Sequence, residues 1–328
     1  MPELRKDPVV SRWVIIAPER ADRPNAHLRA QHEPDEQTCP FCPGNEAMTP
    51  HEVRRAGGRG GTGWTSRVVP NGFPALRVET QMARSGNGLF DQMAGVGAHE
   101  VLIETPEHAL PLSRQSQEQV QALFLAAKER MIDLSRDLRL KSIVFFKNHG
   151  VAAGATLSHS HSQLIALPLV PPELSEELRC AQDHFERKER CVFCDVLKQE
   201  LEQRVRVVHE NDGFVVLSPY AARSPFELWI LPRQHRAIFE QAEPRELLLF
   251  AEALRTVLRK LDVALERPAY NFYLHTLPLR EPLNGYYHWH LELKPMLTQQ
   301  AGFEWGSGVT INPTPPEEAA AFLRKTEV

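Results

Sequence analysis

Residues 156–168 read TLSHSHSQLIALP, and this stretch places His159 and His161 at the entrance to an apolar run that has the pattern of a β-strand. Side chains two apart on a strand share a face. One imidazole on that face can bind a metal while its neighbour, neutral above its ordinary pKa of about 6.5, attacks an electrophile. The pattern favours His161 as a nucleophile and Gln163, further along the same face, as a donor to a phosphoryl oxygen.

The segment before the two histidines is a small-residue loop between two strands. It contains Asn148, Gly150, Gly154 and Thr156, and its glycines let backbone N–H groups come close to a phosphate. For a His-x-His pair alone, two histidines on a half-exposed strand would be the simpler interpretation. The loop and Gln163 together favour a phosphate-facing site.

Length and composition limit the classes of protein to consider. The chain has 328 residues, 42% of them apolar, which is enough for one large or two ordinary domains. Its net charge is 38 − 42 = −4 and it has no basic run, so we do not expect nucleic acid as a partner. It has no N-terminal signal core, and no apolar run approaches the roughly 20 residues that span a membrane. We therefore expect a cytoplasmic protein that does not associate with membranes.

Four of the five cysteines form two Cys-x-x-Cys pairs, Cys39 with Cys42 and Cys191 with Cys194. In a reducing compartment this spacing favours a tetrahedral metal site over disulfides. A thioredoxin-like redox pair is the competing interpretation of the first pair. That motif opens a helix, which the following Pro43-Gly44 would prevent.

The order of motifs recurs along the chain. A Cys pair is followed by a strand (99–104), His108, a helix (116–137), a strand (142–146) and the His-x-His stretch; the second series is the strand 226–231, His235, the helix 244–265, the strand 270–274 and residues 288–290. From His108 to His159 is 51 residues, and from His235 to His288 is 53. The recurrence predicts an internal duplication with one Cys-Cys-His-His site per half.

The prolines at 168, 171 and 172 indicate the joint, so we expect one half over residues 1–172 and the other over 173–328. The glycine- and arginine-rich residues 52–66 predict a flexible loop that lengthens the first half.

Around the His-x-His stretch the chain resembles the galactose-1-phosphate uridylyltransferase family, the nucleotidyltransferase branch of the histidine-triad superfamily. That family carries His-Pro-His-Gly-Gln after an Asn-x-Gly-x3-Gly loop, and here Ser160 and Ser162 replace the Pro and the Gly. With Lys147 before Asn148, where many uridylyltransferases have Glu, this variant is similar to the ADP-glucose phosphorylase branch.

The resemblance implies an α+β fold with two tandem histidine-triad-like halves, whose antiparallel strands join into one extended sheet flanked by helices. It implies a UDP-glucose:hexose-1-phosphate (galactose-1-phosphate) uridylyltransferase that works by a ping-pong mechanism through a covalent nucleotidyl-histidine at His161. Its substrates would be a nucleotide sugar and a sugar 1-phosphate. Three alternatives remain: an ADP-glucose phosphorylase, a histidine-triad nucleotide hydrolase and a non-catalytic, zinc-stapled nucleotide-binding protein.

The resemblance also assigns roles to individual residues. It implies two Zn²⁺ sites per chain. The first would be held by Cys39, Cys42, His108 and His159, and the second by Cys191, Cys194, His235 and His288. His99 is a weaker alternative to His108, and His290 is an alternative to His288. It implies a substrate-binding set of Arg20, Arg23, Asn71, Phe73, Asn148, Gly154, Thr156 and Ser158.

From the residues alone, Arg20 and Arg23 could equally be solvated surface charges, and Phe73 could be a core residue. In the family the segment matching residues 302–313 closes over the sugar phosphate, often from a partner subunit, which implies a homodimer. The family's lysine falls at Gly302, and its galactose-reading tyrosine-glutamate pair falls at Ser307-Gly308.

Overall fold

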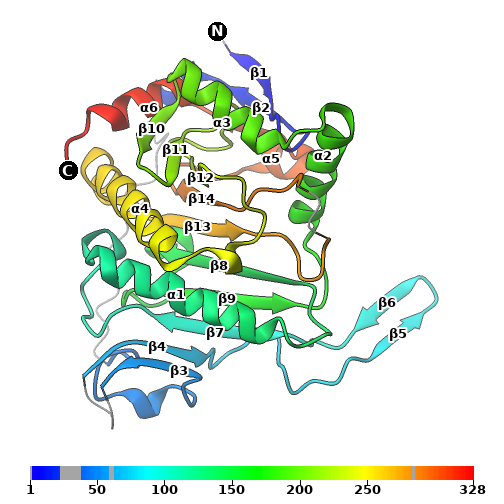
Figure 1. The fold of residues 1–328 in the computed structure, drawn as a ribbon, viewed down its shortest axis with the longest axis vertical. Helices are drawn as coiled ribbons and strands as arrows, with labels where there is room; N and C mark the ends of the chain where they lie inside the picture. The colour runs from blue at the N-terminus through cyan, green and yellow to red at the C-terminus, as the bar shows by residue number, and fades with distance from the viewer. Residues whose placement is uncertain (1, 23–37, 59–62, 283–284) are drawn as a thin grey trace.

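The computed structural model describes residues 2–22, 38–58, 63–282 and 285–328. Its centre is one antiparallel ten-stranded sheet, which confirms the predicted α+β fold (Figure 1). In sheet order the first half supplies β3 (Arg54–Gly57), β4 (Trp64–Pro70), β7 (Ala98–Ile103), β9 (His161–Leu167) and β8 (Ser142–His149). The second half continues with β13 (Tyr270–His275), β14 (His290–Pro295), β12 (Leu228–Pro232), β11 (Phe214–Leu217) and β10 (Val207–Glu210). The second series therefore repeats the first in reverse order.

Two long helices, one from each half, cover one face of this sheet (Figure 1). They are α1 (Gln117–Leu134) and α4 (Pro244–Ala264). A capping box between Ser116 and Gln119 begins α1, because each side chain satisfies a backbone N–H of the first turn. Phe124 of α1 and Phe250 of α4 pack 4.6 Å apart between ring centroids, so one core joins the halves.

Two further helices cover the opposite face of the sheet in the second half. They are α2 (Pro172–Lys188) and α3 (Val192–Gln203), and their apolar residues form a second core with β11 and β12. Within the predicted joint, Pro171 is the N-cap residue of α2 and Pro172 is its first residue. Proline suits the first turn because the N–H that it lacks would have no helical partner there.

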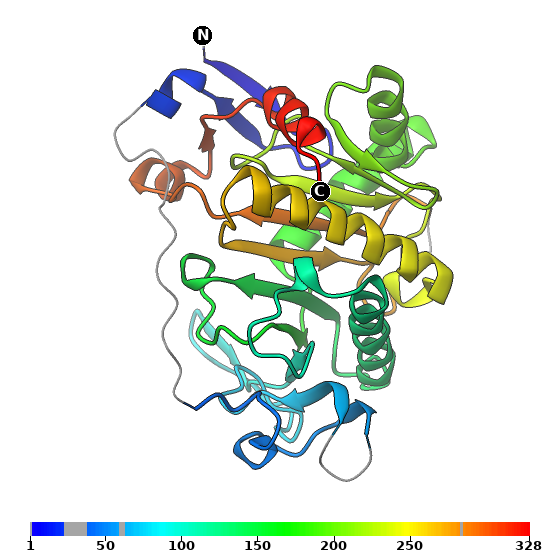
Figure 2. The same cartoon turned by 90° about the vertical axis from the view of Figure 1, so that its left-hand side faces the viewer.

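Smaller elements flank the main sheet. The strands β1 (Glu3–Lys6), β2 (Trp13–Ile16) and β15 (Thr310–Asn312) form a separate sheet; β5 (Arg84–Asn87) and β6 (Phe90–Met93) form a hairpin that projects from the first half (Figure 1). Figure 2 shows α5 (Gly302–Ser307) and α6 (Pro316–Lys325) at the same end of the molecule as β1 and β2. Single 3₁₀ turns lie at η1 (Pro18–Asp22), η2 (Glu46–Met48), η3 (Leu112–Arg114), η4 (Val151–Ala153) and η5 (Phe239–Gln241).

The prediction of a flexible loop over 52–66 is wrong for part of the segment. Arg54–Gly57 form β3, which pairs with β4 from Trp64 onward, and Arg67 of β4 forms an ion pair with Glu52 at 2.9 Å. The two arginines of β3 also have partners, since Arg54 forms an ion pair with Glu129 and Arg55 forms one with Glu52, which composition alone did not reveal.

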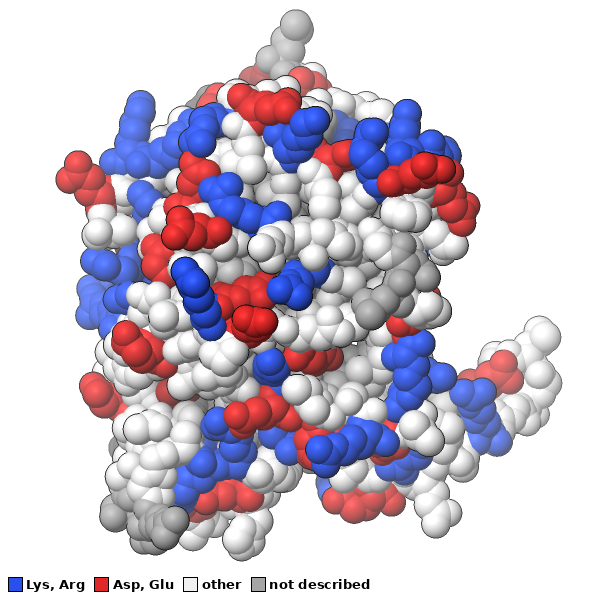
Figure 3. Space-filling view, viewed as in Figure 1, with Lys and Arg blue, Asp and Glu red and all other residues white. Residues whose placement is uncertain are grey.

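Two surface properties bear on possible partners. In the described residues, no helix is long and apolar enough to cross a membrane. On the face shown in Figure 3, basic and acidic side chains are interspersed and do not form a single-sign surface.

Candidate active site and metal centres

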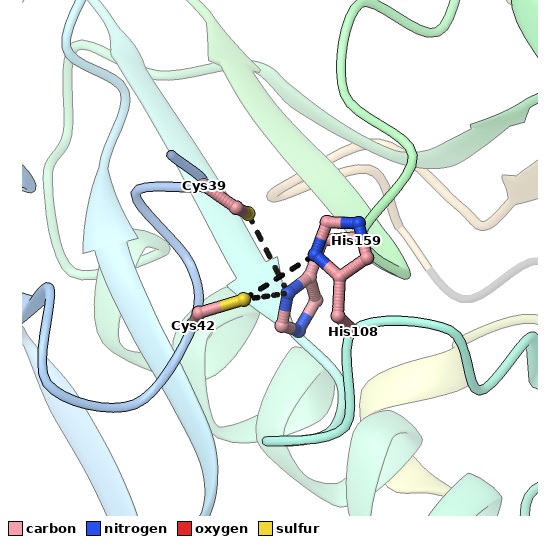
Figure 4. Close-up of side chains that lie close together, drawn as sticks. All are labelled: Cys39, Cys42, His108 and His159. Atoms are coloured by element: carbon pink, nitrogen blue, oxygen red, sulfur yellow. Dashed lines mark hydrogen bonds between the residues drawn. The ribbon is translucent and has the colours of Figure 1, made fainter. Parts of the chain in front are cut away.

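Four side chains from three distant segments of the sequence meet beside the start of β9 (Figure 4). The Sγ of Cys42 lies 3.3 Å from Nδ1 of His108 and 3.6 Å from Nδ1 of His159, and the Sγ of Cys39 also lies 3.6 Å from His159. A tetrahedral zinc with bonds of about 2.0 to 2.3 Å separates its ligand atoms by roughly 3.5 Å. The donors therefore have the chemistry and the spacing for one such ion.

Each histidine of this group also makes a hydrogen bond through Nε2, and the contact of His159 with a carbonyl fixes its tautomer. Nε2 of His159 lies 2.8 Å from the carbonyl of Thr105, and Nε2 of His108 lies 3.0 Å from Oγ of Ser158. A carbonyl can only accept, so the His159 hydrogen is on Nε2 and the lone pair of Nδ1 faces the thiols, as a metal ligand requires. Burial raises the pKa of the Cys39 thiol to about 11, so this thiol would release a proton on binding a cation.

The second half contains the corresponding group of Cys191, Cys194, His235 and His288. Nδ1 of His235 and of His288 lie 3.4 and 3.6 Å from the Sγ of Cys194, and Nε2 of His288 lies 3.0 Å from the carbonyl of Pro232. The hydrogen bond from Cys191 lowers the pKa of the Cys194 thiol to about 3. The first Cys pair lies in a turn, whereas the second begins α3.

Neither alternative ligand joins these groups. His99 contacts Gln163, and His290 lies in a third group with Glu177, His275 and Glu292, whose ligand atoms lie within 4.8 Å of one another. In that group Glu177 accepts from Nδ1 of His275 at 2.7 Å and from the Tyr287 hydroxyl at 2.7 Å. The sequence analysis missed the third group because Glu177 lies in no motif.

His161 is the first residue of β9 and lies on the face of the sheet opposite α1. Its Nδ1 lies 2.8 Å from the carbonyl of His159, so Nδ1 carries the hydrogen and the lone pair is on Nε2. The Phe41 ring, from the turn that carries the first cysteines, packs at 5.3 Å from the His161 ring. Burial, followed by the positive charge of Lys147, lowers the pKa of His161, which favours the neutral, nucleophilic form.

Gln163 lies on the same strand and face, and His99 orients its amide. The backbone N–H of Ala75 donates to Nδ1 of His99 at 3.2 Å, so the hydrogen of His99 is on Nε2 and is donated to Oε1 of Gln163 at 2.8 Å. The Gln163 carbonyl thus points towards His99 and its N–H donors point away. A lone histidine 64 residues earlier gave no signal of this role.

The loop between β8 and β9 is held from the second half. Asn271 of β13 donates to Oδ1 of Asn148 at 2.8 Å and to the carbonyl of Ala153 at 2.9 Å. Gly154 ends η4 in the left-handed conformation, with φ of 85°, and a Cβ on Gly150 would approach Ala269 to 2.8 Å. Both glycines are therefore required by the backbone. Gly154 and Thr156 are exposed, so ligands can reach their main chain.

A charged network lies beneath His161, on the helix-covered side of the sheet. The ammonium of Lys147 contacts both carboxylate oxygens of Glu104 at 2.9 Å, and both residues are almost fully buried. Burial alone would raise the pKa of Glu104, but Lys147 and the hydroxyls of Ser160 and Ser162 hold it below its usual value. This carboxylate is another feature that the sequence analysis missed.

The remaining predicted substrate residues are more dispersed. Phe73 is 95% exposed, so its interpretation as a core residue is wrong. Nδ2 of Asn71 lies 3.1 Å from Nε2 of His99, beside Gln163. Ser158 contacts His108 behind the first metal group. Arg20 is exposed on η1, and Arg23 lies outside the described residues.

The fold and this site are those of a nucleotidyltransferase built from two similar halves. Family models agree: residues 1–171 match the N-terminal domain, and residues 177–306 the C-terminal domain, of galactose-1-phosphate uridyl transferase. The chain belongs to the galactose-1-phosphate uridylyltransferase family and is an enzyme of the hexose-1-phosphate nucleotidyltransferase type.

Individual relatives cover the whole chain. An ADP-glucose phosphorylase of Arabidopsis thaliana is 36% identical over 334 residues, covering 100% of this chain and 93% of the relative. A galactose-1-phosphate uridylyltransferase of Thermotoga maritima is 30% identical, covering 100% and 99%. The crystal structure of an Arabidopsis thaliana ADP-glucose phosphorylase with bound ADP-glucose superposes with a TM-score of 0.87 at 35% identity, covering 100% of both chains. A uridylyltransferase structure superposes with a TM-score of 0.79 at 28% identity, covering 99% and 98%.

Proposed function

We propose that this chain transfers a nucleotidyl group from a nucleoside diphosphate sugar to a phosphate-bearing acceptor through His161. The observation that carries the proposal is the His161 ring, whose Nδ1 is engaged by the His159 carbonyl at 2.8 Å while Nε2 keeps its lone pair. In the first step Nε2 attacks the α-phosphorus, and the bond from that phosphorus to the bridging oxygen breaks. The sugar 1-phosphate leaves with the electron pair.

In the second step an oxygen of the acceptor phosphate attacks the same phosphorus, and the bond to Nε2 breaks. A sugar 1-phosphate acceptor yields a new nucleotide sugar, and inorganic phosphate yields a nucleoside diphosphate. The amide donors of Gln163 and the main chain around Gly154 and Thr156 would stabilise charge on the phosphoryl oxygens, and removing one such donor typically costs about 3 kcal/mol in the barrier.

Zinc, held by Cys39, Cys42, His108 and His159, would supply a structural anchor outside the reaction. His159 is completely buried and donates to Thr105, so a metal at its Nδ1 would fix both ring nitrogens. We assign the corresponding group in the second half, Cys191, Cys194, His235 and His288, as a second structural zinc site. Both would hold the start of a strand, β9 or β14, in register.

The donor that we favour carries adenine. The Arabidopsis thaliana relative at 36% identity is named an ADP-glucose phosphorylase, and the uridylyltransferase of Thermotoga maritima is at 30%. The serines at 160 and 162 and the lysine at 147 point to the same branch. UDP-glucose with galactose 1-phosphate is the alternative pair.

Incubation with ADP-glucose or with UDP-glucose, followed by intact-mass measurement, tests both the covalent role of His161 and the identity of the nucleotide. We expect the mass of one AMP to be added in wild type and not in His161→Ala. An added UMP would identify a uridylyl donor. An adduct on His161→Ala would show that another residue is the nucleophile, and turnover without any adduct would contradict the covalent mechanism. The absence of both adduct and turnover would favour a binding protein. Labelled sugar 1-phosphate should exchange into the nucleotide sugar, which a hydrolase would not catalyse.

We also propose a cellular location and an oligomeric state for the enzyme. None of the five cysteines, all of which lie in the described residues, forms a disulfide, and this suits a reducing, cytoplasmic location. Phe303 and Trp305 on α5 are 50% and 76% exposed, and large exposed aromatic side chains are typical of protein interfaces. We assign this surface to a homodimer contact and assign no role in nucleic-acid binding.

A further inference from the structure

The buried network beneath His161 ends on the nucleophile's own main chain. Nζ of Lys147 donates to the carbonyl oxygen of His161 at 2.9 Å, in addition to its contacts with Glu104 and a 3.1 Å contact with Oγ of Ser160. Lys147 is 1% exposed and Glu104 is 2% exposed. The ammonium is therefore shared between a carboxylate and the backbone of one residue.

The two serines of the motif complete this network. The hydroxyl of Ser160 donates to Oε2 of Glu104 at 2.5 Å, and the hydroxyl of Ser162 donates to Oε1 at 2.5 Å. Each carboxylate oxygen thus accepts from Lys147 and from one serine. Such charge-assisted hydrogen bonds are about twice as strong as neutral ones, so Glu104 holds Lys147 in one place.

The second half has the same arrangement of strands, but uncharged side chains occupy the positions equivalent to this network. Leu102 pairs with Ser162 across β7 and β9, and Ile230 pairs with Leu291 across β12 and β14, so Leu291 is the counterpart of Ser162. By the same registers, Trp289, Leu274 and Pro232 are the counterparts of Ser160, Lys147 and Glu104. All four counterparts are buried, and Trp289, Leu274 and Leu291 belong to the main core.

Stability does not account for this difference between the halves. Taking two charges out of water costs several kcal/mol per ion in proteins, and replacing a buried ion pair with apolar residues is often neutral or stabilising. The second half shows that apolar residues satisfy this fold. The charged network of the first half adds the hydrogen bond from Lys147 to the carbonyl oxygen of His161.

We propose that Lys147, held by Glu104, Ser160 and Ser162, is a positioning residue that clamps the main chain of His161 and so aims its ring at the phosphorus. The ring follows the main chain because Nδ1 is tied to the carbonyl of His159, two residues earlier. This inference rests on the proposed function, since it concerns the same nucleophile.

The test is a variant that gives the first half an apolar network: Lys147→Leu, Glu104→Leu, Ser160→Ala and Ser162→Ala together. Removing both charges avoids leaving either one buried alone. We expect the variant to fold with an unfolding midpoint at or above that of wild type. We expect kcat for exchange between nucleotide sugar and sugar 1-phosphate to fall about 100-fold, as for a reacting group displaced by about 1 Å, with KM for the nucleotide sugar changed less than about threefold.

A matched control lies four residues before Glu104, on the same face of the sheet. Glu100 of β7 accepts two hydrogen bonds from Arg130 of α1, at 2.8 and 2.7 Å. The paired variant Glu100→Met with Arg130→Met also removes a largely buried ion pair, yet this pair does not contact His161. We expect it to keep the wild-type kcat.

A folded apolar variant with kcat within threefold of wild type would overturn the inference, and so would an equal loss in the control. If the apolar variant does not fold, the double variant Ser160→Ala with Ser162→Ala decides the question, because it keeps the ion pair. A fall in kcat of about tenfold supports the clamp, and an unchanged kcat overturns it. Rapid-quench mass measurement of the His161 adduct separates the two proposals: no adduct in wild type refutes the proposed function, whereas equally fast adducts in wild type and variant refute only the clamp.

Discussion

His161 and His290 occupy equivalent positions at the starts of β9 and β14, and their immediate geometry is nearly the same. Nδ1 of each lies close to the carbonyl of the residue two before it, at 2.8 Å for His161 and 3.1 Å for His290. The surroundings differ, because α2 covers the second half. Glu177 of α2 lies 3.9 Å from Nε2 of His290, whereas the ring of Phe41 packs against His161; both histidines are buried. The comparison teaches that the two halves keep the strand geometry of these histidines while packing different side chains against their rings.

The largest expected effect comes from removing each histidine in turn. His161→Ala should lower nucleotidyl transfer by about four orders of magnitude or more, as for other catalytic nucleophiles. His290→Ala should keep turnover per folded molecule within about tenfold of wild type, because Glu177 and α2 separate its ring from substrate. Steady-state exchange rates, normalised to folded protein by circular dichroism, measure both. Equal losses in the two variants would break the comparison.

The two Cys-x-x-Cys pairs allow a second comparison between the halves. Wild-type protein should contain two zinc ions per chain by elemental analysis, and replacing either pair with serine should leave one. Loss of either ion should destabilise the fold by several kcal/mol, on the order of structural zinc sites. Only the variant Cys39→Ser with Cys42→Ser should also lose about 100-fold in kcat, because His159 no longer fixes the strand of His161. Full activity in that variant would contradict the anchoring role.

The smallest expected effect concerns an ion pair that attaches the long helix α4 to β10 in the second half. Glu252 of α4 contacts His209 at 3.2 Å, and hydrogen bonding from His209 lowers the pKa of Glu252 to about 2. Because the folded pKa lies below the unfolded value of about 4.3, this contribution is present above that value and disappears as the pH falls towards 2.

Glu252→Gln should lower the unfolding free energy by about 1 kcal/mol at pH 7, after allowance for the solvent that screens this half-exposed pair. The difference from wild type should vanish between pH 4.3 and 2, as measured by urea unfolding at several pH values. A difference that persists at pH 2 would rule out the carboxylate as its source.

The sequence predicted those features that recur or follow a fixed spacing. The recurrence of motifs predicted the sheet and the members of both Cys-Cys-His-His groups, because the Cys-x-x-Cys spacing and the separation of the two histidines, 51 and 53 residues, repeat in the two halves. The contact between Lys147 and Glu104 spans 43 residues and appears in no motif, so it could not be predicted. The same holds for Glu177 with His275, and for His99, whose contact with Gln163 depends on the register of β7 with β9.

The antiparallel seam between β8 and β13 has a consequence for dissecting the enzyme. Tyr270 pairs with His149 and Leu274 with Phe145, and Asn271 reaches across to the loop before His161. A fragment ending near residue 171 would expose β8 as an unprotected edge, which favours aggregation. Co-expressing it with the complementary fragment should rebuild the seam and restore nucleotidyl transfer, so the second half would act as an obligatory folding partner.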